Sequence, residues 1–261
     1  MANLAEISAG LPPTVSVYWR DSYLSSYSSQ AIKAVPDEKK FWYIVLDGTI
    51  FHPKGGGQPS DKGFLQGANF RLEVRKAMFS GAVVVHWGKL LDGSLEPGPV
   101  KGEVDWDWRY LLMRRHSAAH LLDHSLVKVI GRDVETLDSW LGEPCYVAYK
   151  GDPPSQGQLA QIERVENETI MRGGRIEARE VAADEVHQSF SDSPNFDRLP
   201  GLKRLRLVAI EGCRPIGCGG THLRDISEVK GIKVKGLEKV PEGFRIHFDL
   251  CQETVSMSRV V

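Results

Sequence analysis

The stretch RYLLMRRHSAAHLLDHSLVKVI, residues 109–130, decides the fold of the second half of this 261-residue chain. Its apolar residues recur every three or four positions, and Gly131 follows as a natural stop, so we expect one long helix. A second helix is predicted over GQLAQIERVENETIMRGG, residues 157–174, which also carries its apolar residues on one face. This second helix should cover a sheet.

Short β-type runs surround these two helices. Between Thr14 and about Val104, the runs TVSVYW, FWYIVLDG, FRLEVRK, GAVVVHWG and VKGEVDW are broken by Gly, Pro and Asp, which predicts a compact β-barrel. After the second helix, RIEARE, RLRLVAIEG, GIKVKGLEKV and FRIHFDL predict a mostly antiparallel sheet. A short helix is expected through VAADEVHQ, residues 181–188.

The predicted fold class is therefore α+β, in two domains. We expect a small N-terminal β-barrel domain at residues 1–106, in which residues 1–13 form a loosely held extension ending in two prolines. An α+β domain, with helices packed on an antiparallel sheet, should follow at residues 107–261.

Composition excludes several classes of protein. Hydrophobic residues make up 41% of the chain and charged residues 26%, as in soluble globular proteins, and the net charge is −1. Contact with a nucleic acid must therefore come from a local basic patch. No apolar run is long enough to cross a bilayer and the start does not resemble a signal peptide, so we expect no membrane partner and a cytoplasmic location.

Two pairs of residues suit a metal ion. His116 and His120 are four positions apart on the predicted long helix, so both imidazoles project from one face. In CRPIGCGGTHLRD, Cys218 and His222 flank two glycines, which allow a tight turn with positive φ that brings thiolate and imidazole together. Alone, the histidine pair is more commonly explained by ordinary surface or partly buried histidines, and the Cys–His pair is explained equally well by an incidental glycine-rich turn. Together they form the N/S donor set that Zn²⁺ prefers.

Paired histidines on a helix also occur in metallopeptidases. Those enzymes place a Glu directly after the first histidine, in the pattern HExxH, to act as general base. Ser117 occupies that position here. The sequence therefore disfavours a metallopeptidase.

The motifs resemble those of one known family. HSAAH at 116–120 with CGGTH at 218–222 resembles the paired zinc motif of the alanyl-tRNA synthetase editing domain and of its free-standing AlaX relatives. FHPKGGGQPSDKG at 51–63 is similar to the glycine-rich motif in the β-barrel domain of the synthetase and of medium or larger AlaX proteins. The three motifs occur in the family's order.

The resemblance implies a function. A β-barrel should pack beside an editing domain that binds Zn²⁺ through His116, His120, Cys218 and His222 and hydrolyses mischarged Ser-tRNA(Ala), often Gly-tRNA(Ala) as well, in trans. The tRNA(Ala) acceptor end is the expected partner. The alternative is a zinc-stabilised module that binds tRNA or another nucleic acid without catalysis.

Several substrate contacts are expected from the same resemblance. The loop formed by Gly55, Gly56, Gly57 and Gln58, which could otherwise be a simple hairpin turn, is expected to overlie the pocket and screen the amino acid. The synthetase motif usually has a hydroxyl residue where this chain has Ala119. Ser117 or Thr221 would then have to contact a seryl substrate. Asp61 is interpreted as a turn residue.

Other roles stay open at this stage. If all four ligands bind at once, the site is closed, which is typical of structural zinc. Either one ligand, most readily His222, leaves the metal so that water or substrate binds, or zinc orders the pocket and expands to five coordinates; we favour the exchangeable position. Backbone N–H groups of CGGTH are candidates to hold the oxyanion, and no side chain is assigned as general base. The oligomeric state, monomer or homodimer, is left open. Phosphates of the acceptor end are expected to contact Arg114, Arg115 and Arg214.

Overall fold

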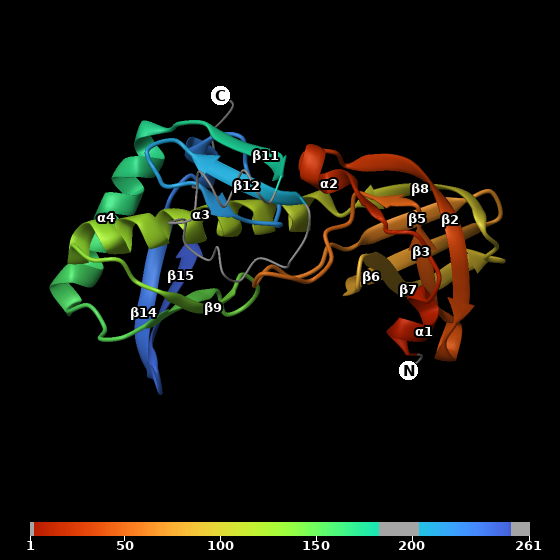
Figure 1. The fold of residues 1–261 in the computed structure, drawn as a ribbon, viewed down its shortest axis with the longest axis horizontal. Coiled ribbons are helices and arrows are strands. Elements are labelled where there is room, and N and C mark those ends of the chain that lie inside the picture. The colour runs from red at the N-terminus through yellow and green to blue at the C-terminus, as the bar shows by residue number, and fades with distance from the viewer. Residues whose placement is uncertain (1–2, 183–203, 252–261) are drawn as a thin grey trace, which may run out of the picture.

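The first part of the chain forms a closed barrel. The computed structural model describes residues 3–182 and 204–251. Six antiparallel strands close in the order β2-β3-β7-β6-β5-β8 (Figure 1). Their bounds are β2 Ser26–Pro36, β3 Phe41–Leu46, β5 Gly63–Gly67, β6 Phe70–Ser80, β7 Val83–Gly93 and β8 Gly98–Val104. The predicted barrel is confirmed, and its interior is filled by fully buried residues such as Ile44, Leu65 and Leu72.

The N-terminal segment differs from the prediction. Residues 1–13 were expected to be loosely held, but helix α1 (Leu4–Ser8) packs on the barrel through Ile7, which is 3% exposed and touches the cluster around Tyr43. The predicted strand TVSVYW is short. Only β1 (Val15–Ser16) forms, parallel to β4 (Gly48–Thr49), and helix α2 (Val17–Arg20) follows.

Both predicted long helices are confirmed. Helix α3 (Trp106–Ile130) begins after Asp105, whose side chain accepts from the N–H of Trp108, and ends at Gly131, where φ is 73°. Helix α4 (Gln156–Arg172) begins at a capping box formed by Ser155 and Gln158. It packs against α3 and against strand β14 (Ile232–Val240).

The helices lie against antiparallel sheets, which confirms the α+β class. One sheet has the order β14-β15-β10-β9 and another the order β11-β12-β13. The bounds are β9 Thr136–Trp140, β10 Tyr146–Lys150, β11 Ile176–Ala182, β12 Arg204–Ile210, β13 Ile216–Gly217, β14 Ile232–Val240 and β15 Gly243–Leu250. The expected helix at 181–188 begins within β11, and its residues after Ala182 lie outside the described residues.

A buried ion pair joins the barrel to α3. Arg109 and Asp61 are both fully buried, and Nε of Arg109 donates to Oδ1 of Asp61 at 2.9 Å. Nη1 of Arg109 also donates to the carbonyl of Ser22 at 2.9 Å. Asp61 is therefore far more than a turn residue: it neutralises the charge at the point where the barrel meets the helix. The expected division between residues 106 and 107 falls at this junction and stays a prediction.

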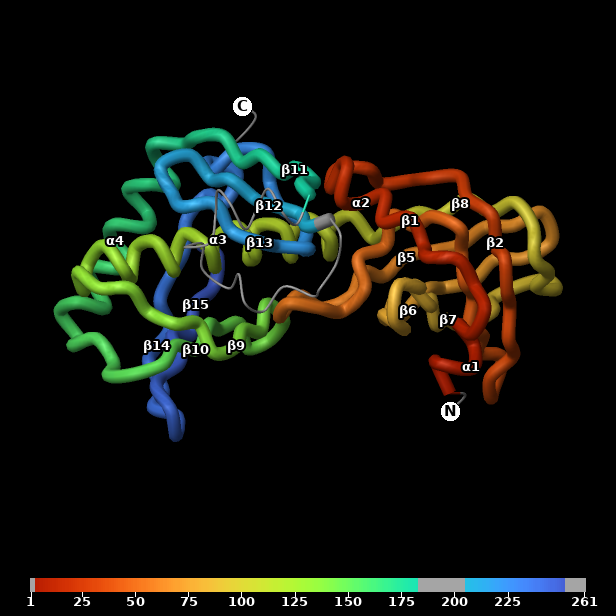
Figure 2. Tube along the Cα trace, viewed as in Figure 1, coloured from red at the N-terminus to blue at the C-terminus, as the bar shows by residue number. Residues whose placement is uncertain are grey.

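A second connection joins the barrel to strand β9. Figure 2 shows the segment between β4 and β5, in orange, leaving the barrel and reaching β9. There, the N–H of Leu141 donates to the carbonyl of Gly57 at 3.0 Å. Within residues 3–182 and 204–251, no helix is both long enough and apolar enough to cross a membrane.

Candidate functional site

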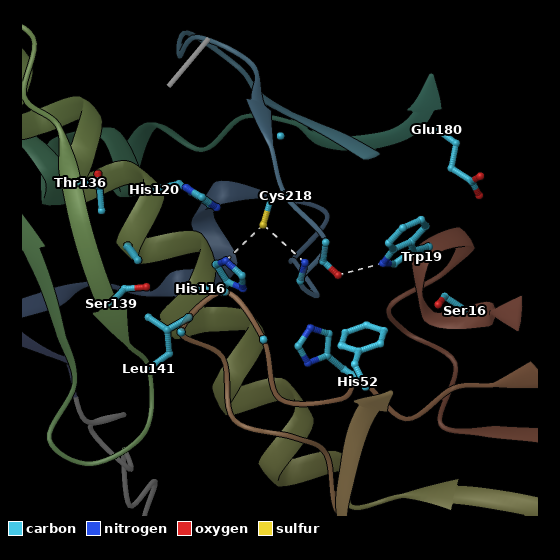
Figure 3. A pocket seen from close by; sticks show the side chains of 18 of the residues that line it. Ser16, Trp19, His52, His116, His120, Thr136, Ser139, Leu141, Glu180 and Cys218 are labelled. Atoms are coloured by element: carbon cyan, nitrogen blue, oxygen red, sulfur yellow. Dashed lines mark hydrogen bonds between the residues drawn. The ribbon is translucent and has the colours of Figure 1, made fainter. Parts of the chain in front are cut away.

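Four predicted metal ligands converge. His116 and His120 project from one face of α3 with ring centroids 5.0 Å apart, and Cys218 and His222 lie on the loop that follows β13. One donor atom from each of the four lies within 4.8 Å of the others. Sγ of Cys218 lies 3.3 Å from Nε2 of His116 (Figure 3). The same sulfur lies 3.3 Å from Nε2 of His222.

The donor set fits a metal ion. His120 is buried, yet neither of its ring nitrogens has a hydrogen-bond partner in the described part of the chain. Oδ2 of Asp123 lies 3.8 Å from Nδ1, too far for a hydrogen bond. A buried imidazole without a partner costs free energy. One thiolate and three imidazoles around such a group suit a borderline-soft ion such as Zn²⁺.

For two of the four donors, Cys218 and His222, the pKa shifts also favour the protonation state that binds a metal ion. Burial raises the pKa of the Cys218 thiol, but the adjacent His116 and His222 outweigh it and hold the pKa well below its usual value. Burial lowers the pKa of His222 to about 3. Thiolate and neutral imidazole are the forms that bind metals. For His120, burial is outweighed by Asp123 and Cys218, which raise its pKa to about 10, so metal binding there would release a proton.

The glycines of CGGTH allow the loop to lie close to His116. Neither Gly219 nor Gly220 has positive φ, so the expectation that they allow a turn with positive φ is wrong. A Cβ on Gly220 would lie 2.1 Å from Cε1 of His116, so only glycine lets this loop reach the histidine. Nη1 of the buried Arg206 donates to the carbonyls of Gly220 at 2.7 Å and Cys218 at 3.0 Å and holds the loop in place.

The glycine-rich loop forms a tight hairpin turn that touches the second sheet. The backbones of Gly55 and Gln58 pair in both directions, and Gly56 and Gly57 have φ values of 53° and 77°. A Cβ on Gly57 would lie 2.1 Å from Oγ of Ser139. Glycine at this position therefore lets the barrel loop press against β9.

Gln58 does not line the cleft and instead positions the candidate metal ligand His116 and the CGGTH loop. It is fully buried, and its Oε1 accepts from Nδ1 of His116 at 2.7 Å and from the N–H of Thr221 at 3.1 Å. Its Nε2 donates to Oγ1 of Thr221 at 2.9 Å. Ser117 is similar: its Oγ accepts from the N–H of Leu223 at 3.2 Å and lies 3.4 Å from Nδ1 of His222.

These contacts correct the expected substrate contacts. A cleft of about 850 Å³ lies between the barrel and α3, and neither Gln58, Ser117 nor Thr221 lines it. Their polar groups are used inside the protein, so they position the cluster. The cleft is lined by groups that include Gly55, Gly56, Gly57, His116, Ala119, His120 and Cys218.

Two of the three arginines expected to bind tRNA are buried. Arg114 donates from Nη2 to the carbonyl of Val229 at 2.9 Å. Arg115 donates from Nη1 to the carbonyl of Gly142 at 2.9 Å and pairs with Asp249 at 3.0 Å. Helix α3 turns both toward the core, so the expectation that they meet phosphates is wrong. Arg214 is exposed, at 66% of its side chain.

The structure adds cleft residues that the sequence did not reveal. His52 is 3% exposed and lines the cleft beside His116, and burial lowers its pKa well below the usual value. Thr136 and Ser139 of β9 supply hydroxyl groups on the opposite wall. His52 stands inside the glycine-rich motif and was a visible candidate, whereas the polar run TLDSW gave no signal of a strand.

Comparison with known proteins identifies the family of this chain. Residues 22–108 match the family model described as tRNA synthetases class II (A). The chain is 31% identical over 247 residues to the alanyl-tRNA editing protein AlaX-M of Methanosarcina barkeri, covering 91% of this chain and 99% of that protein. The AlaX-M protein of Methanosarcina acetivorans is also 31% identical, over 249 residues, with 91% and 99% covered.

Alanine–tRNA ligases match over part of their length. The ligase of Ignicoccus hospitalis is 31% identical over 254 residues, which cover 94% of this chain but only 27% of the ligase. The chain thus spans about a quarter of the ligases that it matches and nearly the whole of the editing proteins. It belongs to the AlaX-M family of alanyl-tRNA editing proteins.

Proposed function

We propose that this protein removes serine, and secondarily glycine, from mischarged tRNA(Ala) in a reaction that depends on Zn²⁺. The observation that carries the proposal is the convergence of four donor side chains, three of which, His116, His120 and Cys218, line a cleft that opens to solvent. The ion, when bound, supplies positive charge that polarises the ester carbonyl and makes a water molecule more acidic.

The protein's own residues orient the donors. Because Oε1 of Gln58 can only accept, Nδ1 of His116 carries the proton and Nε2 faces Cys218. His222 completes the set but does not line the cleft. An exchangeable position is therefore better sought among the three ligands that line the cleft, in place of the earlier preference for His222.

One backbone group is a candidate to hold the oxyanion. The N–H of Gly220 points to Sγ of Cys218 at 3.5 Å, and that of Thr221 donates to Gln58. Gly219 lines the cleft, and its N–H has no hydrogen-bond partner within residues 3–182 and 204–251. We assign the developing negative charge to this N–H group.

Substrate choice rests on the walls of the cleft. Ala119 lines it and offers no hydroxyl, so Thr136 and Ser139 are proposed to contact the seryl hydroxyl.

The exposed Arg214, which pairs with Asp133 at 3.3 Å, is proposed to contact a phosphate of the acceptor end. We propose that the chain acts in trans and in the cytoplasm, with the barrel domain at residues 1–106 and the editing domain at 107–261.

The test compares three substrates. Release of amino acid from Ser-, Gly- and Ala-tRNA(Ala) is measured before and after chelation, and again after Zn²⁺ is added back. We expect serine release to exceed glycine release, alanine to be retained, and chelation to abolish activity reversibly. Equal loss of alanine would contradict editing. Activity that survives complete removal of metal would contradict zinc dependence, and tight tRNA binding with no release would favour the non-catalytic binding module.

A further inference from the structure

The cleft is larger than an aminoacyl group needs. Its volume is about 850 Å³, in the range of pockets that hold whole cofactors. It extends from the four-ligand cluster to the end of the barrel, where Val15 and Phe79 line it. Each of these two is 46% exposed, and they belong to the few large apolar side chains that are exposed in the described residues.

These two apolar side chains lie close to the glycine-rich loop and to the turn between β6 and β7. Phe79 precedes the turn between β6 and β7, and its Cε2 lies 3.7 Å from the Cβ position of Gly55. The N–H of Thr14 donates to the carbonyl of Ala82 in the same turn at 3.0 Å, so Val15 follows directly beside it. The result is an apolar surface next to the glycine-rich loop.

Polar groups border this surface. His52 is buried and lines the cleft, and its Nδ1 has no hydrogen-bond partner in the described part of the chain. Nε1 of Trp19 donates to the carbonyl of Gly219 at 2.9 Å and so links the barrel side to the CGGTH loop. Figure 3 shows Trp19 and His52 on the barrel side of His116 and Cys218, with Ser139 on the opposite side.

We infer that the part of the cleft lined by Val15 and Phe79, the adenosine compartment, binds the terminal adenosine of the aminoacyl-tRNA. The flat face of adenine lies against Phe79 and Val15. The inference rests on the proposed function, since the ester bond joins the amino acid to the ribose of that nucleoside. When the carbonyl lies at the cluster, ribose and base must occupy adjoining space, and the compartment at the end of the barrel is continuous with it. Aromatic side chains stack on bases irrespective of sequence.

The first test is kinetic. Phe79→Ala should raise the KM for Ser-tRNA(Ala) about tenfold, as loss of one stacked base does, and leave kcat within about twofold. Phe79→Tyr keeps the ring and should behave like the natural protein. Leu91→Ala is the matched control, because Leu91 is also 46% exposed but lies outside the cleft. An unchanged KM in Phe79→Ala, or an equal change in Leu91→Ala, would overturn the inference.

The second test separates this inference from the proposed function. The probe is 3′-(L-serylamino)-3′-deoxyadenosine, whose amide replaces the ester, and its affinity is measured by calorimetry against that of serinamide. The natural protein should bind the nucleoside probe more tightly than serinamide, and Phe79→Ala should lose most of that advantage. Equal affinity of both proteins for the probe overturns the adenosine compartment. Binding that depends on Phe79, in a protein that releases no serine, contradicts only the proposed function.

Discussion

Gln58, on the glycine-rich loop of the barrel, accepts a hydrogen bond from Nδ1 of His116 at 2.7 Å. The two residues come from opposite sides of the junction, yet both are buried. The bond selects one tautomer of His116 and turns its Nε2 toward Cys218, as the partners of metal-binding histidines generally do. The barrel therefore contributes directly to the four-ligand cluster.

Gln58→Leu should weaken Zn²⁺ binding by about 10- to 100-fold, because it removes the acceptor that orients His116. Competition with a chromophoric chelator measures the affinity. Gln66→Leu, on an exposed position of β5, is the control and should bind Zn²⁺ normally. If both variants bind Zn²⁺ as the natural protein does, Gln58 has no part in holding the site.

Gly220→Ala should disrupt the cluster, since the added Cβ would lie 2.1 Å from the ring of His116. We expect loss of Zn²⁺ affinity and a lower Tm. Gly219→Ala is the matched control, because its Cβ would meet only Trp19, at 3.7 Å, an ordinary contact. Metal titration and thermal unfolding of the two variants check the prediction, and similar behaviour of both would count against it.

Asp61→Asn should destabilise the protein by about 3–5 kcal/mol, because it leaves the buried charge of Arg109 without its counterion. The free energy of unfolding in urea is the measurement. Glu73→Gln breaks the exposed pair with Arg75 and should cost less than about 1 kcal/mol. A loss in Asp61→Asn as small as that in Glu73→Gln would show that the buried pair does not hold the junction.

Glu166→Gln should change how stability depends on pH. Burial, with the nearby Asp123 and Glu163, raises the pKa of Glu166 well above its usual value, and neither carboxylate oxygen has a partner among the described residues. A raised folded-state pKa gives stability that is complete below the unfolded-state pKa of about 4.3 and is lost as pH rises through the folded-state pKa. The neutral amide has no such loss.

The Tm of Glu166→Gln relative to the natural protein should therefore increase as pH rises from about 4. Thermal unfolding across pH 4 to about 9 measures it. Glu168→Gln, at a 54% exposed position of the same helix, is the control for loss of a carboxyl group that is not buried. A constant difference for Glu166→Gln would mean that its carboxyl group titrates normally in the folded protein.

Periodic apolar patterns predicted much of the fold. Helix α3 shows its spacing and its glycine stop in the sequence, and both appear in the structure. Strand β2, by contrast, was not predicted: its run SYSSQAIKAVP is largely polar, and Ala31 is its only residue below 9% exposure. The strand forms because neighbours on both sides supply its hydrogen bonds, which a local pattern does not reveal.

The sequence predicted the donor residues of the candidate site, but not the residues that hold them in position. Spacing alone brought His116 and His120 to one face, and a Gly-flanked pair suggested the rest. The partners of Arg114 and Arg115 are mostly carbonyl groups remote in sequence, such as those of Val229 and Gly142. No spacing rule distinguishes an arginine that binds such groups from one that faces solvent, so both were placed on the wrong surface.

The reach of the glycine-rich loop has a thermodynamic consequence. If Gln58 favours the metal-bound cluster, linkage requires that metal binding favours, by the same free energy, the arrangement in which the barrel loop touches α3 and β9. Zn²⁺ would then stabilise the contact between the barrel and the second half of the chain, in addition to its proposed role in the reaction. A higher concentration of Zn²⁺ would increase the fraction of molecules in which the barrel loop contacts α3 and β9.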